Sequence, residues 1–445
     1  MISRRSILAA AACLLLASGV SLASTSIPST AKTILDYPEI PAAGEIKSDL
    51  APPASAFHAW QTADAEAQKV LASWDTEPLT VPWTRIQLDR FVKHKMMPTR
   101  GARGLALVHV AMYDALQIAD QRRVSGKLAV SMAAAQVLAY LFPAEERAFD
   151  RIAFCAAARM HNTKPETLPA NVTLALAIGQ KVGQRVIAYG EADGAQRGWN
   201  GIRLQWYGEG RYYAPGTWQP TPPYFYYPPD EPFAPGWKTW VLERAEEFRP
   251  LPPAFGSPKF IKDLQELIEI NRTLTPKQLE IAKFWVDGHG SVTPPGHWNR
   301  IAIEEANRAH IDDATAARLF AVLNVAMADA FIAAWESKYH YWTMRPVTAA
   351  KAVLNIEMKP AILTPPFPSY VSGHASFSGA AAAVLGAYFP ARAKELKAMG
   401  EEAALSRLLG GIHYRHDNED GLTLGRRVAE KTLNRLLQPA GPAPK

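Results

Sequence analysis

The spacing of apolar residues predicts that most of the chain is α-helical. From about residue 84 to residue 192, apolar side chains recur at intervals of three and four, which places them on one face of a helix. Further helices are expected over 130–142, 144–161 and 168–191. The clearest apolar face consists of Leu105, Val108, His109, Met112, Tyr113 and Leu116.

The same spacing returns after residue 256. The segment 313–338 is apolar enough to suggest a membrane span, but Arg318, Asp329 and Glu336 interrupt it. We therefore expect a buried helix there, and an all-α fold built of helical bundles. The predicted helices cover 257–270, 276–286, 296–309, 313–338, 374–388, 393–409 and 418–436.

Residues 206–255 break the helical pattern. Eleven of the 35 prolines lie between Pro215 and Pro253, among many tyrosines and tryptophans. Proline removes backbone donors and blocks regular helix, whereas disordered segments usually lack aromatic residues. We expect an irregular but ordered connector, held by ring packing near the mouth of an active site.

The N-terminus has the composition of an export signal. Arg4 and Arg5 precede a long apolar run, and small residues in Ser21–Ala23 predict cleavage before Ser24. The stretch Ser3–Leu8 also resembles a twin-arginine signal. The mature protein is therefore expected in the periplasm or outside the cell. The expected parts are a signal peptide (1–23), an N-terminal arm (24–75), an N-terminal helical region (76–205), the connector (206–255), a catalytic helical domain (256–437) and a tail (438–445).

Charge and cysteine content exclude other classes of protein. The net charge of +6 falls to +4 without residues 1–23, which contain two arginines and no acids. The charges are scattered, with no basic run among aromatic residues, which argues against nucleic-acid binding. Cys155 is the one cysteine left after cleavage, so no intrachain disulfide is expected, and its alanine neighbours indicate a packed thiol.

Three short segments near the C-terminus carry the candidate chemistry. Their spacings are Lys-x6-Arg-Pro, Ser-Gly-His and Ser-Arg-x5-His-x3-Asp. Each combines basic, hydroxyl or imidazole side chains that can contact a small anion. In chain order the candidate residues are Lys338, Arg345, Ser372, Gly373, His374, Arg407, His413 and Asp417.

Together these side chains suit a tetrahedral oxyanion. Such an anion carries two or three negative charges and needs matched cations, which Lys338, Arg345 and Arg407 would supply. Ser372 offers a hydroxyl group, and Gly373, at the expected start of a helix, leaves its amide open to an oxygen atom. The sequence therefore predicts one pocket for phosphate or vanadate.

The two histidines would carry the reaction. His413 and Asp417 stand four residues apart, so they share a face if the segment is helical. The carboxylate would then hold one ring nitrogen and leave the other aimed at the central atom, as a nucleophile on phosphorus or an axial ligand to vanadium. His374 would move a proton.

Two other interpretations use the same residues. His413, His416 and Asp417, together with His289 or His297, could bind zinc or iron in a hydrolase. That interpretation leaves three cations beside a metal dication unexplained. A non-enzymatic anion-binding protein is the second, but such a site would need neither histidine of the motifs.

The three spacings resemble the motifs of the superfamily that joins type-2 phosphatidic acid phosphatases, bacterial acid phosphatases and vanadium-dependent haloperoxidases. The first and third match in full, whereas Val371 stands where the second has proline. Trp285–Gly288, Thr293–Trp298 and Leu107–Ala115 resemble bacterial haloperoxidase-like members. The resemblance covers roughly residues 80–436 and implies helical bundles of the vanadium chloroperoxidase type.

The resemblance also implies roles. His413 would be the axial or nucleophilic histidine and His374 the acid–base histidine. Asp287 would pair with the arginine of the third motif and assist catalysis, as would Asp417. Trp335 and Phe367 match positions that line a halide pocket. The implied oxyanion ligands are Lys338, Arg345, Ser372, Gly373 and Arg407.

The resemblance leaves two activities open. A haloperoxidase would bind vanadate as cofactor and use peroxide and halide as substrates, whereas a periplasmic acid phosphatase would need no cofactor and would cleave phosphomonoesters through a phosphohistidine at His413. Asp287 and the residues from Trp335 to Lys338 favour the haloperoxidase-like branch. A membrane lipid phosphatase is disfavoured because no set of spanning helices accompanies the motifs. A homodimer is compatible with either activity.

Overall fold

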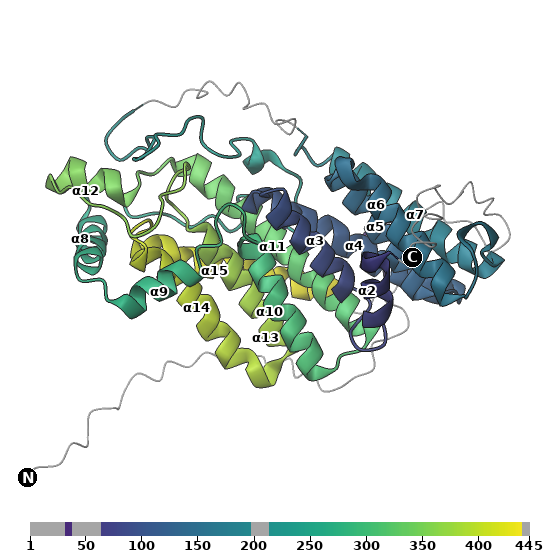
Figure 1. Ribbon diagram of the computed structural model, residues 1–445. Coiled ribbons are helices and arrows are strands. Elements are labelled where there is room, and N and C mark those ends of the chain that lie inside the picture. The colour runs from purple at the N-terminus through teal and green to yellow at the C-terminus, as the bar shows by residue number, and fades with distance from the viewer. Residues whose placement is uncertain (1–31, 38–63, 197–212, 438–445) are drawn as a thin grey trace, which may run out of the picture.

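The computed structural model describes residues 32–37, 64–196 and 213–437, and nearly all their regular structure is helical (Figure 1). These residues include no β-strand, and one isolated bridge pairs Thr217 with Thr343. The all-α fold predicted from periodicity is therefore confirmed. The predicted signal peptide, most of the N-terminal arm, the first residues of the connector and the tail lie outside the described residues.

The first group of helices packs around one hydrophobic core. Leu105, Val108 and Met112 are fully buried in it, as their spacing predicts. The predicted arm contains a helix of its own, because Asp64 caps it and Val70 packs on the core. The helices are α2 (Ala65–Ser73), α3 (Val81–Lys93), α4 (Pro98–Arg122), α5 (Gly126–Leu141), α6 (Glu146–Met160) and α7 (Ala170–Glu191).

Most helices of the second group surround a second core, whereas α8 (Pro258–Arg272) and α12 (Pro346–Leu354) pack in a smaller third cluster. Most of their bounds agree with the predicted ones within a few residues. One helix, Pro346–Leu354, was not predicted, because nine residues are too few to establish a helical period. The helices are α8 (Pro258–Arg272), α9 (Pro276–Phe284), α10 (Thr293–Ala309), α11 (Asp313–Tyr341), α12 (Pro346–Leu354), α13 (Gly373–Tyr388), α14 (Ala393–Leu409) and α15 (Arg415–Leu437).

Helix α11 belongs to both cores and runs through the middle of the molecule (Figure 1). Ala317, Ala321 and Val325 face the first core, whereas Phe320 and Phe331 belong to the second. A helix covered on all sides has no polar face. Helix α11 is long and apolar enough to cross a membrane, but 94% of its apolar stretch is buried inside the protein. Because one helix serves both cores, the predicted boundary between the two helical regions stays a prediction.

The described part of the connector, residues 213–255, is irregular as predicted. Its one helical turn is the 3-10 turn η3 (Ala234–Gly236). The buried carboxylate of Asp329 accepts hydrogen bonds from the amides of residues 240, 241 and 242, at 2.8, 2.7 and 3.0 Å. Trp237 lies edge-on to Phe331, with ring centroids 5.5 Å apart. The Asp329 carboxylate of α11 thus satisfies backbone amides that lie outside any regular helix.

Helices α13 and α15 approach so closely that only glycine fits at their contact. A Cβ atom on Gly425 would lie 2.1 Å from the carbonyl oxygen of Ser376, and one on Gly379 would lie 2.4 Å from a carbonyl oxygen of α15. Both obstacles are backbone atoms, which no side-chain rotation can move. The close approach brings the first turns of the two helices together, where the Ser372 amide donates to the Asp417 carbonyl at 2.9 Å.

Candidate oxyanion site

Lys338 is placed by the last turn of α11. Its side chain is fully buried, and Nζ donates hydrogen bonds to the carbonyl oxygens of Pro368 and Ser369, both at 2.9 Å. Burial, reinforced by the charge of Arg345, lowers the pKa of Lys338 well below its ordinary value. An ammonium group has three N–H donors. One of them therefore has no acceptor among the described residues and is available to a bound anion.

Arg345 is the N-cap of α12, which Pro346 begins. Nε donates to the carbonyl of Phe367 at 2.8 Å, and Nη1 donates to the carbonyl of Ile412 at 2.9 Å and to Nε2 of His413 at 3.0 Å. Nη2 is buried and has no hydrogen-bond partner in the described part of the chain. Burial lowers the pKa of Arg345 to about 9. A buried guanidinium with one unused nitrogen is suited to an oxyanion.

The first turn of α13 adds hydroxyl and amide donors. Ser372 is the N-cap, and its Oγ accepts a long hydrogen bond from the amide of Ala375, at 3.4 Å. The amides of Gly373 and His374 have no acceptor among the residues that the structure describes. They lie at the positive end of a 16-residue helix. A Cβ atom on Gly373 would lie 3.2 Å from the Trp335 ring, so glycine lets that ring pack on the helix start.

His413 and Asp417 form the predicted pair, but not within one helix. His413 lies in the bend before α15, and Asp417 lies in the first turn of that helix. Nδ1 of His413 is 2.8 Å from Oδ2 of Asp417, which also accepts a hydrogen bond from Ser369 Oγ at 2.5 Å. The hydrogen-bond network therefore assigns the proton to Nδ1 and leaves Nε2 as the acceptor from Arg345.

The pKa values of this pair are shifted in ways that preserve that tautomer. Burial, followed by the charge of Arg345, lowers the pKa of His413 well below its ordinary value. Burial alone would raise the pKa of Asp417, but the hydrogen bond from His413 and its other contacts hold it at about 2. At neutral pH the site thus holds a neutral imidazole against an ionised carboxylate.

Arg407 lies in the last turn of α14 and is 2% exposed. Nε donates to Ser406 Oγ at 2.9 Å and Nη2 donates to the carbonyl of Ala282 at 3.1 Å. Burial lowers the pKa of Arg407 to about 9, against the opposing charge of Asp287. The carboxylate of Asp287 contacts Nδ1 of His297 at 2.9 Å and acts on Arg407 through its charge, so the expected pairing of Asp287 with Arg407 stays a prediction.

His374 supplies a second imidazole, one of whose ring nitrogens has no partner among the described residues. Its Nε2 atom is buried and makes no hydrogen bond to the described residues. Burial, together with the charges of Arg407 and His413, lowers the pKa of His374 well below its ordinary value. Hydrogen bonding to the backbone of Val286 and Trp285 acts in the opposite direction. The ring is therefore neutral near pH 7 and can accept a proton.

The residues predicted for the pocket are brought together from four helices and two loops. The charge of Arg345 lowers the pKa of Lys338, and the charges of Arg345 and Lys338 lower the pKa of His413. The charges of Arg407 and His413 likewise lower the pKa of His374, so these side chains lie close together. Within the described ranges, Asp417 is the one carboxylate hydrogen-bonded to this group of side chains. The three buried basic side chains, Lys338, Arg345 and Arg407, outnumber this carboxylate, and a bound oxyanion would supply the missing negative charge. The residues fit vanadate and phosphate alike.

Trp335 and Phe367 lie beside the cations. Their ring centroids are 4.9 Å apart, and the Lys338 ammonium lies 5.6 Å from the first and 5.0 Å from the second. Trp335 Nε1 and the Tyr339 hydroxyl both donate to the carbonyl of Asp230, at 3.2 and 2.6 Å. The connector therefore reaches the site, as expected, whereas halide contact by the two rings stays a prediction.

Sequence reasoning missed the contacts that three residues make. Ser369 holds Asp417 from 48 positions away, His416 lies between Asp263 and Asp417, and His297 takes the partner expected for Arg407. His416 directly precedes Asp417 in the chain, but no short motif joins Ser369 to Asp417 or Asp263 to His416, so no local signal could have found those two contacts. In the described part of the chain, no group of three His, Cys, Asp or Glu side chains is arranged to hold a metal ion. The structure thus gives the zinc or iron alternative no support.

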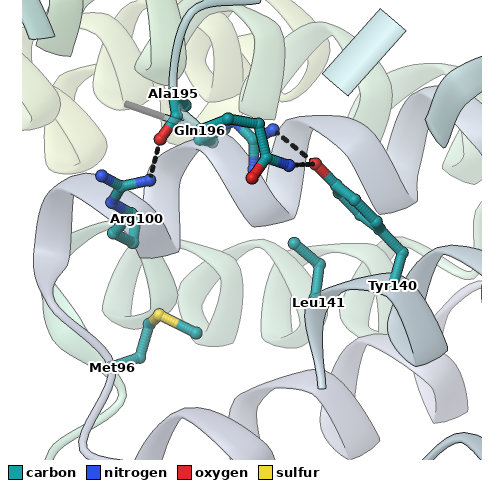
Figure 2. A pocket seen from close by; sticks show the side chains of 7 residues that line it. Met96, Arg100, Tyr140, Leu141, Ala195 and Gln196 are labelled. Carbon is teal, nitrogen blue, oxygen red and sulfur yellow. Dashed lines mark hydrogen bonds between the residues drawn. The ribbon is translucent and has the colours of Figure 1, made fainter. Parts of the chain in front are cut away.

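A separate small pocket lies between α4, α5 and residues 195–196 (Figure 2). Its volume is about 30 Å³, which is enough for ordered water and no larger ligand. Its charged groups are already engaged, since Arg103 contacts Asp193 at 2.6 Å and Arg100 contacts Glu231 at 2.6 Å. This pocket contributes nothing to the anion chemistry.

Fold and site together define an all-α protein built to bind a small oxyanion. The family described as the vanadium chloroperoxidase second helical-bundle domain matches residues 318–358 and 390–441. The vanadium chloroperoxidase of Curvularia inaequalis is 31% identical over 144 residues, which cover 26% of this chain and 24% of that protein. The chain thus matches about a quarter of the length of that curated relative.

Solved structures extend the similarity to most of the chain. A bacterial vanadium-dependent iodoperoxidase superposes with a TM-score of 0.69 at 25% identity, over 81% of this chain and 97% of that one. A bacterial vanadium-dependent chloroperoxidase in its apo form gives 0.61 at 15% identity, over 77% and 94%. The chain is thus similar in fold to bacterial vanadium-dependent haloperoxidases, and part of its C-terminal half matches a vanadium chloroperoxidase domain, in agreement with the superfamily that the three motifs resemble.

Proposed function

We propose that the protein is a vanadate-dependent haloperoxidase that oxidises halide ions with hydrogen peroxide. The observation that carries the proposal is the pair of buried nitrogen atoms without hydrogen-bond partners among the described residues, Arg345 Nη2 and His374 Nε2, in a site with three buried basic side chains. The similarity to a vanadium-dependent iodoperoxidase over 97% of its length favours vanadate over phosphate as the resident anion. Iodide is for the same reason the first halide to test.

Each residue of the site has its own proposed role in binding the anion. Lys338, Arg345 and Arg407 would neutralise the anion, while the hydroxyl of Ser372 and the amide of Gly373 would hydrogen-bond its oxygen atoms. His413 would bind the central atom through Nε2, the ring nitrogen that does not contact Asp417. Vanadate bound in this way would supply the Lewis acid that activates peroxide toward halide.

His374 and the aromatic rings would handle the two substrates. Because its lowered pKa keeps the ring neutral near pH 7, His374 can accept a proton from hydrogen peroxide at Nε2. Trp335 and Phe367 lie against the Lys338 ammonium, so a halide ion between ring edges and this charge would be attracted to the site. This is the proposed halide position.

A loading experiment followed by paired assays tests the proposal. The purified protein is dialysed against vanadate, bound vanadium is measured, and peroxide-dependent oxidation of iodide, bromide and chloride is compared with hydrolysis of p-nitrophenyl phosphate. We expect one vanadium per chain, halide oxidation that depends on loading, and no hydrolysis by the loaded protein. Phosphate-ester hydrolysis by the unloaded protein, with no halide oxidation at full loading, would instead assign the phosphatase activity.

A variant links the activity to the site. Arg345→Met removes charge-assisted donors to the anion, which contribute about 3 kcal/mol, and should weaken vanadate binding about 100-fold. Arg272→Met, at an exposed arginine on α8, is the matched control and should bind vanadate as the unmodified protein does. Equal affinity in both variants would show that vanadate binds elsewhere.

We also propose that the mature protein is exported. Arg4 and Arg5, the apolar run after them and the small residues of Ser21–Ala23 support cleavage before Ser24. Cell fractionation and N-terminal sequencing of the mature chain test this. A cytoplasmic protein that retains residues 1–23 would contradict it.

A further inference from the structure

His416 lies between two buried carboxylates next to the candidate site. Its Nδ1 is 2.7 Å from Oδ2 of Asp263 on α8, and its Nε2 is 3.4 Å from Oδ1 of Asp417. All three side chains are at least nine-tenths buried. On the side away from the site, Nζ of Lys259 donates to the two carboxylate oxygens of Asp263, at 2.9 and 2.8 Å. A chain of polar contacts thus runs from the surface of α8 to the centre of the anion pocket.

The two oxygens of Asp417 have different partners. Oδ2 accepts from His413 and Ser369, whereas Oδ1 makes no ordinary hydrogen bond and faces only His416 among the described residues. Both ring nitrogens of His416 face carboxylate oxygens, and a protonated ring nitrogen donates to such an oxygen. The geometry therefore directs one side of the ring at Asp263 and the other at Asp417.

The pKa values of the two carboxyl groups agree with these contacts. For Asp263, burial would raise the pKa, but the hydrogen bonds from Lys259 and His416 bring it below the ordinary value. For Asp417, the charge of His416 adds to the hydrogen bond from His413 in overcoming burial. The imidazole also stacks on Tyr414, with centroids 5.0 Å apart and planes inclined by 10°. The ring is thus held by packing as well as by charge.

We propose that His416, fixed by Asp263, is a positioning residue that holds Oδ1 of Asp417 and thereby keeps Oδ2 directed at Nδ1 of His413. With Nδ1 held in this way, the Nε2 atom of His413 stays unprotonated; it accepts from Arg345 in this structure, and a bound anion would take the place of that contact. The contribution to turnover rests on the proposed haloperoxidase function. The positioning of His413 is a property of the chain alone and can be measured without turnover.

Substitutions of His416 separate positioning from packing. His416→Phe keeps a flat ring against Tyr414 but removes both donors, whereas His416→Gln keeps a donor group that can reach Asp417. The matched control is His94→Phe, because His94 likewise contacts a carboxylate, Glu145, and stacks on an aromatic ring, at the C-terminal end of α3. Asp263→Asn removes the charge that fixes the ring and serves if His416→Phe does not fold.

The first readout is nuclear magnetic resonance of protein labelled with 15N-histidine. In the unmodified protein, the His413 signals should show a proton on Nδ1 and none on Nε2. His416→Phe should mix the two tautomers of His413, and His416→Gln should restore part of the original pattern. The control substitution should leave the His413 signals unchanged.

The second readout is the dissociation constant for vanadate, measured by equilibrium dialysis. Loss of a residue that orients a ligand typically weakens binding 10- to 100-fold, and we expect His416→Phe to fall in about that range. Asp263→Asn should shift both readouts in the same direction by less. Unchanged His413 signals and a dissociation constant within about twofold in folded His416→Phe would overturn the proposal. If the tautomer of His413 changes in His416→Phe but the loaded, unmodified protein does not oxidise halide, the positioning role stands and the haloperoxidase function is rejected.

Discussion

The hydroxyl of Ser369 offers a direct measure of how the site is held together. Ser369 is fully buried, and its Oγ donates to Oδ2 of Asp417 at 2.5 Å. The substitution Ser369→Ala removes this donor and leaves the second partner of Oδ2, His413, in place. We expect the variant to be less stable and to bind vanadate more weakly, because the carboxylate that orients His413 becomes less constrained.

The size of the effect follows from two considerations. A hydrogen bond to a buried charged group contributes about 1.5–3 kcal/mol. The pKa of Asp417, about 2 against the ordinary 3.8, corresponds to about 2 kcal/mol of stability at neutral pH, shared among all of its partners. Loss of one partner should therefore lower the free energy of unfolding by about 1–2 kcal/mol.

Urea unfolding followed by tryptophan fluorescence measures this difference. The matched control is Ser337→Ala, because Ser337 is also fully buried but its Oγ has no hydrogen-bond partner among the described residues. Removal of that hydroxyl should leave stability unchanged or slightly raise it. The two variants thus differ in whether the deleted group was hydrogen-bonded.

The pH dependence tests the cause. Because the folded-state pKa of Asp417 is lowered, its stabilisation is present above about pH 4 and is lost as the pH falls toward 2. Ser369→Ala should bring that pKa closer to its ordinary value, so the difference from the unmodified protein should be full at pH 7 and shrink between pH 4 and pH 3. Equal losses in the two serine variants, or a loss for Ser369→Ala that does not shrink with acid, would refute the reasoning.

Two further predictions concern the scaffold. Gly425→Ala should lower the free energy of unfolding by about 3 kcal/mol or more, because its Cβ would lie 2.1 Å from the carbonyl oxygen of Ser376. The control is Gly236→Ala, where a Cβ meets nothing within 4 Å, and similar urea midpoints for the two variants would contradict the prediction. Asp329→Ala should leave the amides of residues 240–242 without acceptors and speed their hydrogen exchange, at a cost of about 3 kcal/mol; unchanged exchange rates would show that the carboxylate does not anchor the connector.

Much of the fold could be predicted because helices are specified locally. The spacing of Leu105, Val108 and Met112 predicted one face of α4, and these residues are buried. The irregular connector followed from its prolines in the same way. The short helix α12 escaped prediction because a nine-residue segment spans too few turns to display a period.

The identity of the pocket residues was also readable from the sequence. Lys338, Arg345, Arg407 and the two motif histidines stand in spacings specific enough to indicate one anion site. The structure brings these residues together from separate helices. The hydrogen-bond partners of these groups could not be predicted, because a spacing shows which residue types are present but not which atoms come into contact.

Tertiary packing alone decided the partners of the charged groups. Asp287 hydrogen-bonds to His297, whereas Arg407 donates to the hydroxyl of Ser406 and the carbonyl of Ala282. Ser369 reaches Asp417 across 48 positions, and Asp263 reaches His416 across 153. A helix repeats every 3.6 residues whatever packs against it, so the spacing of apolar residues along the chain is enough to predict it. Contacts at these separations depend on how whole helices pack, which no local pattern records.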